Sequence, residues 1–151
     1  MSIEQQINED LKTALKAGEK QIVSAFRTIL AQIKDERIRL RVQREMTEED
    51  VIGVLLNAAK KRKEALDIYR QNDREDLAKK EEAELKLIQK YLPKQMSGDE
   101  VKEFIKKIIQ QTNATSIKDL GMVMGAAMKE LKGKADGQLI QSIVRDQLSQ
   151  I

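Results

Sequence analysis

One proline, Pro93, interrupts a chain of 151 residues in which apolar side chains recur every three or four positions. This spacing matches the 3.6-residue turn of an α-helix. Proline cannot continue a helix, because it lacks an amide proton and pushes the preceding residue out of the helical region. The residues that are frequent here, such as Lys, Glu, Leu, Ala and Gln, all favour helix. The sequence therefore predicts an all-α protein.

Pro93 also sets the predicted domain boundary. Residues 1–93 form an N-terminal helical domain and residues 94–151 a small three-helix C-terminal domain. The N-terminal domain holds four predicted helices, of which the second is long, and they cover residues 2–18, 19–44, 47–72 and 73–92. Capping patterns such as Thr47-x-x-Asp50, or Ser97-x-x-Glu100 beyond the proline, give their starts. The three C-terminal helices begin at the caps Ser97, Ser116 and Asp136.

Histidine and cysteine are both absent from the chain. Their absence excludes disulfide bonds, thiol nucleophiles, zinc sites built from Cys and His, and the imidazole general base. The spacing of the remaining Lys, Ser, Tyr and carboxylates assembles no nucleophile, base and orienting group. We therefore predict a protein that is not an enzyme, with no catalytic residues, no metal site and no cofactor.

The charge and the hydropathy of the chain bound its partners. A formal net charge of +3 permits a nucleic acid partner without requiring one. No apolar run approaches the ~18 residues of a membrane span, and the start, MSIEQQINED, has no basic region followed by an apolar stretch. No membrane partner is expected, and the cytoplasm is the expected compartment.

Three arginines follow the apolar face of the predicted 19–44 helix. This face is apolar as far as Ile33 and then presents Arg37, Arg41 and Arg44 at helical spacing. One interpretation is a row of guanidinium groups that binds phosphates, because Arg holds phosphate oxygens through two parallel hydrogen bonds. The other, which we favour, is a set of ion pairs, because surface charge runs are usually solvated or paired within the chain. The candidate acids across the turn are Glu45, Glu48, Glu49 and Asp50.

A second basic group lies between the last two predicted helices. In the segment LKGKADG, Lys132 and Lys134 come beside the N-terminal amides of the last helix, and such amides attract anions. Lys118 and Lys129 lie within about a quarter of the helix circumference of Lys132. These lysines either form an anion site or only surround a helix that Asp136 caps, and the sequence gives both interpretations equal weight.

Gly121 and Gly125 are four residues apart in the predicted helix before this segment. Each glycine costs a helix ~1 kcal/mol relative to alanine. Their spacing allows a neighbouring backbone to approach closely. We interpret them as packing positions inside the protein.

Five runs of the sequence resemble known families. Those in the last third are YLPKQMS at 91–97, GMVMGAAM at 121–128 and LKGKADG at 131–137. This part resembles the tail domain of the B subunit of the bacterial aminoacyl-tRNA amidotransferase. Upstream, NDREDLA at 72–78 and E-x-x-E-L at 81–85 resemble the free-standing YqeY proteins. The resemblance to the YqeY family, through this GatB/YqeY domain, extends over essentially the whole chain.

The resemblance implies a non-catalytic accessory module that binds tRNA in aminoacyl-tRNA synthesis or in tRNA-dependent transamidation. Its further partner would be an aminoacyl-tRNA synthetase or an amidotransferase. A label of carbon-nitrogen ligase with glutamine as amido donor would be inherited from that complex, not intrinsic. The alternative is a protein-interaction adaptor that docks on such an enzyme without touching RNA. The candidate RNA contacts are Lys118, Lys129, Lys132 and Lys134, with Arg37, Arg41 and Arg44 as a second contact.

Overall fold

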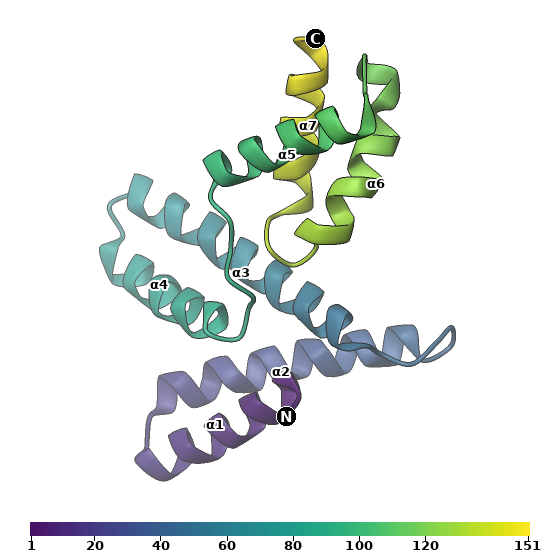
Figure 1. Cartoon of the computed structure of the whole chain (residues 1–151). Helices are drawn as coiled ribbons and strands as arrows, with labels where there is room; N and C mark the ends of the chain where they lie inside the picture. The colour runs from purple at the N-terminus through teal and green to yellow at the C-terminus, as the bar shows by residue number, and fades with distance from the viewer. The chain divides into compact units, whose positions relative to one another are not determined.

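Caps and turns divide residues 1–151, all described by the computed structural model, into seven α-helices and one 3-10 helix (Figure 1). No segment is a β-strand, so the prediction of an all-α protein is confirmed. None of the helices has both the length and the apolar character that a membrane-spanning segment requires. The elements are α1 (Ile3–Ala17), α2 (Lys20–Leu40), α3 (Glu48–Gln71), α4 (Glu75–Gln89), α5 (Gly98–Thr112), η1 (Ile117–Asp119), α6 (Leu120–Leu131) and α7 (Gly137–Ser149).

The chain divides into two compact units, Met1–Leu92 and Pro93–Ile151, which we call the N-terminal unit and the C-terminal unit. The N-terminal unit consists of two helical hairpins, α1 with α2 and α3 with α4 (Figure 1). Each of these four helices places a fully buried side chain in one shared core, and these are Ile7, Ile29, Leu55 and Ile88. The unit therefore has a core that is independent of the C-terminal helices.

Tyr91 lies at the edge of this core, next to Phe26 with an edge-on ring contact of 6.1 Å between centroids. Its hydroxyl donates a hydrogen bond to the Asp10 carboxylate on α1. Burial raises the pKa of Tyr91, and the Asp10 carboxylate raises it further, so the phenol stays protonated at neutral pH. The residue that precedes Leu92 and Pro93 is thus tied to the first helix of the same unit.

The C-terminal unit packs α5, α6 and α7 around a second core. Its fully buried side chains come from all three helices, and they include Val101, Ile105, Val123, Leu131, Ile140 and Val144. Before α6, the Asp119 carboxylate accepts hydrogen bonds from the amides of Thr115 at 2.8 Å and Ser116 at 3.3 Å. These amides lower the pKa of Asp119, and they hold the turn from which α6 begins.

Two of the predicted helix boundaries are wrong. The second helix ends at Leu40 instead of Arg44, because the residues after it form a turn. The fourth helix is capped by Arg74 and not by Asn72 or Asp73. Asp73 has φ 54°, a left-handed conformation that ends α3, whereas an N-cap residue has an extended backbone.

Candidate nucleic-acid interface

α6 buries one side and exposes the opposite one. Gly121, Gly125 and Lys129 are exposed and follow one another in steps of four residues, so they lie in a row along the helix. Met122 is exposed beside them, with 48% of its surface accessible. We call these four residues the outer face of α6. The buried residues on the other side are Val123, Ala127 and Leu131.

The two glycines of the outer face have no packing role within this chain. A Cβ atom built at Gly121 or at Gly125 would meet no atom within 4 Å. The interpretation of these glycines as internal packing positions is therefore wrong, because the side on which a neighbouring backbone could approach faces open space. Each glycine still costs helix stability of ~1 kcal/mol relative to alanine. The pair leaves exposed backbone free for close approach by something outside the chain.

The four candidate lysines of the C-terminal unit are all exposed. Lys118 lies in η1 at the start of α6 and Lys129 in its last turn, so they flank the two glycines. Lys132 and Lys134 lie in the turn that follows, which we call the lysine turn (residues 132–134). No carboxylate pairs with Lys118, Lys129 or Lys134. The structure therefore places Lys129 and the lysine turn together at one end of the outer face, with Lys118 at the other end.

The lysine turn is held in place by the segment just after Pro93. The Gln95 side-chain amide donates to the carbonyl oxygen of Gly133 at 2.8 Å, and the Met96 amide donates to that of Lys134 at 2.8 Å. Gly133 itself has φ 81°, a left-handed conformation that glycine adopts without steric cost. Gln95 was not predicted as a site residue, because no pattern in the sequence connects it with a partner 38 positions away.

We expect Gly133→Ala to lower the free energy of unfolding by about 1 kcal/mol, because a Cβ atom is strained at this positive φ. The measurement is urea unfolding followed by circular dichroism. Gly137→Ala is the matched control, since Gly137 is the first residue of α7 and an added Cβ there meets nothing within 4 Å. Equal effects of the two substitutions would contradict a strained turn at Gly133.

The N-terminus of α7 is occupied by its own cap. The Asp136 carboxylate accepts a hydrogen bond from the Gln138 amide at 3.4 Å. A carboxylate in this position takes up the amide that would otherwise face an external anion. Of the two interpretations of this segment, the structure therefore supports Asp136 as a cap. The exposed ammonium groups of Lys129 and Lys134 remain available to an external anion.

The three arginines of the N-terminal unit do not form a continuous row of free guanidinium groups. Arg37 donates two hydrogen bonds to the Glu4 carboxylate on α1. Arg44 donates two to Asp50 on α3, at 2.6 and 2.9 Å. The Arg44 guanidinium holds the pKa of the Asp50 carboxyl well below its ordinary value, with the Thr47 amide as a second cause. Arg41 is exposed, and no carboxylate pairs with it.

Comparisons with known proteins give relatives of two kinds. Over 144 residues the chain is 28% identical to "Altered inheritance of mitochondria protein 41, mitochondrial" of Vanderwaltozyma polyspora, covering 91% of this chain and 77% of that one. An uncharacterised protein of Schizosaccharomyces pombe is 32% identical over 92 residues, which are 61% of this chain and 73% of that protein. These relatives match this chain over most of their own length.

The second kind of relative is an amidotransferase component. A subunit of the Glutamyl-tRNA(Gln) amidotransferase of Thermococcus gammatolerans is 35% identical over 60 residues, which are 37% of this chain and 10% of that protein. The expected likeness to an aminoacyl-tRNA amidotransferase subunit is thus confirmed. The model of the Yqey-like protein family matches residues 4–148. With nearly its whole length matched, this chain belongs to the YqeY family.

Proposed function

We propose that this protein is a non-catalytic accessory module that binds transfer RNA through the outer face of α6 and the lysine turn. The observation that carries the proposal is the position of Gly121 and Gly125, which lie open to solvent between exposed lysines at both ends of α6. A helix that serves only its own fold gains nothing from two exposed glycines. A helix that an RNA backbone approaches closely does gain from them, because the absence of Cβ atoms shortens the distance of approach.

The lysines supply the electrostatic part of this contact. Lysine ammonium groups bind phosphate oxygens, and such contacts position a protein on RNA without reading its bases. Few cations take part, and the formal net charge of the chain is only +3, so we expect weak binding that falls with salt. Arg37 and Arg44 are engaged by carboxylates of the N-terminal unit, so the proposed contact rests on the lysines.

The relatives add an indirect argument. The amidotransferase of Thermococcus gammatolerans carries Glutamyl-tRNA(Gln) in its name, and the matched stretch is only 10% of the related subunit. A segment so small is more consistent with an appended binding module than with the catalytic body of the enzyme. The proposal therefore transfers an association with transfer RNA to this chain, without the amidotransferase activity.

A second candidate function is docking on a protein through the same face. Exposed Met122 favours it, because methionine is adaptable and frequent at protein-binding surfaces. The partner would then be an aminoacyl-tRNA synthetase or an amidotransferase subunit. An adaptor of this kind would bind its partner after nuclease treatment and at high salt, whereas RNA-mediated association would be lost under both conditions.

We expect Lys129→Ala/Lys134→Ala to weaken binding of unfractionated transfer RNA several-fold at low salt. The same change should reduce the slope of log affinity against log salt concentration by about 1–2, since each lost phosphate contact removes about 1. The measurement is fluorescence anisotropy over a salt series. Lys102→Ala/Lys107→Ala on α5 is the control, since it removes the same charge from exposed positions of the same unit. Unchanged binding by the first variant, or equal loss in the control, would refute the proposed interface.

A further inference from the structure

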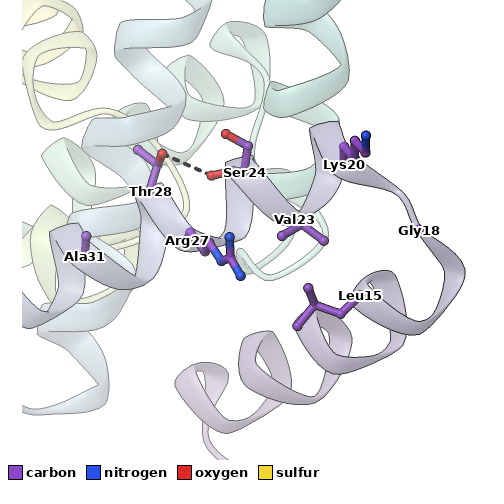
Figure 2. A pocket seen from close by; sticks show the side chains of 8 residues that line it. All are labelled: Leu15, Gly18, Lys20, Val23, Ser24, Arg27, Thr28 and Ala31. Carbon is purple, nitrogen blue, oxygen red and sulfur yellow. Dashed lines mark hydrogen bonds between the residues drawn. The ribbon is translucent and has the colours of Figure 1, made fainter.

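A groove between α1 and α2 of the N-terminal unit takes no part in the proposed RNA contact. Its volume is about 630 Å³, and Leu15 and Gly18, at the end of α1, line it together with one face of α2. Figure 2 shows Leu15 pointing from α1 toward Val23, while the Arg27 side chain extends into the space between the two helices. The α2 residues that line this α1–α2 groove are Lys20, Val23, Ser24, Arg27, Thr28 and Ala31.

The shape of the α1–α2 groove suits a helix. Its first and last α2 residues, Lys20 and Ala31, are separated by about 16 Å along the helix axis, or three turns. Between them, Ser24 and Thr28 are small and exposed, at the helical spacing that lets a second helix pack closely. A groove this long and open on one side would not enclose most of a small molecule, as small-molecule sites do.

The wall of the groove is apolar on the α1 side. Leu15 leaves 48% of its surface exposed, although it follows the buried Ala14 in a helix that packs on α2. Val23 is nearly buried beneath it. A partner side chain placed over Leu15 would remove this apolar surface from water, which favours association. RNA phosphates would gain nothing from such a wall.

Two cations stand in the groove without partners. Neither Lys20 nor Arg27 forms an ion pair. This differs from the other arginines of the unit, of which six bind carboxylates: Arg37, Arg39, Arg44, Arg62, Arg70 and Arg74. Lys20 and Arg27 are seven residues apart, which is two helical turns on the same face of α2.

We propose that the α1–α2 groove binds an amphipathic helix of a partner protein, with an apolar side chain over Leu15 and two carboxylates about two turns apart opposite Lys20 and Arg27. Charge complementarity selects an acidic helix. The apolar wall separates this site from a phosphate-binding surface. The proposal concerns the N-terminal unit and does not depend on RNA binding by the C-terminal unit.

The test is a selection from a displayed library of 16-residue helical peptides on the full-length protein. Contact positions of the peptides are randomised among Leu, Ala, Gln, Lys, Arg, Asp and Glu. We expect the selected peptides to carry Asp or Glu seven residues apart beside a Leu. Synthetic copies should bind Arg27→Glu and Leu15→Ser at least tenfold more weakly than the wild type. Arg145→Glu is the control, since Arg145 is an exposed arginine without a carboxylate partner in the other unit, and it should bind normally.

A charge exchange makes the test specific. Replacing the glutamate opposite Arg27 by lysine in the selected peptide should restore binding to the Arg27→Glu protein at least fivefold. Circular dichroism checks that each variant is folded. No enrichment above the Arg27→Glu protein, selection of neutral or basic peptides, or displacement of the peptide by transfer RNA with equal sensitivity to Arg27→Glu would each overturn the proposal.

Discussion

Alanine at both Gly121 and Gly125 is expected to stabilise the protein and, at the same time, to weaken its binding of transfer RNA. The stability gain should be about 1–2 kcal/mol, because each exposed mid-helix glycine costs up to ~1 kcal/mol relative to alanine and an added Cβ meets no atom of the chain at either position. Binding should weaken at least tenfold if the RNA backbone approaches the outer face of α6 as closely as we propose. The two effects have opposite signs, so loss of folding cannot imitate the result.

Gly53→Ala is the matched control for this pair. Gly53 is also exposed within a helix, α3, and an added Cβ there meets nothing within 4 Å. It should therefore raise the free energy of unfolding by a similar amount per residue, about 1 kcal/mol, and leave RNA binding unchanged. Urea unfolding and anisotropy titrations provide the two measurements. Binding by Gly121→Ala/Gly125→Ala at the wild-type level would remove the outer face of α6 from the proposed interface.

The helices were predictable because the interactions that define them are local. Thr47 caps α3 as predicted, since its side chain accepts from the Asp50 amide while the Asp50 carboxylate accepts from the Thr47 amide. Gly133, just after α6, takes the left-handed conformation that the sequence indicates for a residue beyond a helix end. Asp73 misled the prediction, because an Asp can either cap a helix or end one in the left-handed region, and the pattern does not distinguish the two.

The site was less predictable because its important relations are not local. The ion pair of Arg44 with Asp50 was among the candidates, but that of Arg37 with Glu4 joins residues 33 positions apart on different helices. Gly121 and Gly125 were recognised as positions of close approach. Only the structure reveals that the approaching group is not part of this chain. The α1–α2 groove depends on which cations lack carboxylates, and spacing along the chain does not contain this information.

Ile140→Ala is expected to unfold much of the C-terminal unit while the N-terminal unit stays native. Ile140 is fully buried in the core of α5, α6 and α7. Truncating such a residue costs about 2–5 kcal/mol, through lost apolar contact and the cavity that remains. A domain below ~70 residues rarely has more than about 3–5 kcal/mol of stability from its core. The loss is thus comparable with the whole stability of this unit.

The tyrosines allow the two units to be followed separately. Both tyrosines, Tyr69 and Tyr91, lie in the N-terminal unit, and the chain has no tryptophan. Tyrosine fluorescence therefore reports on the N-terminal unit, whereas far-ultraviolet circular dichroism reports on the helices of both. With Ile140→Ala, helix content should fall at low urea while the tyrosine transition stays in place. Ile29→Ala, at an equally buried position of the other core, should move the tyrosine transition instead.

This pair of variants also tests where RNA binds. If the outer face of α6 and the lysine turn hold the RNA, Ile140→Ala should abolish binding under conditions in which tyrosine fluorescence is still native. Ile29→Ala should retain binding as long as the C-terminal helices persist. A common shift of both transitions in either variant would mean that the units unfold as one cooperative structure. Because the cores share no buried residue, we expect the transitions to separate.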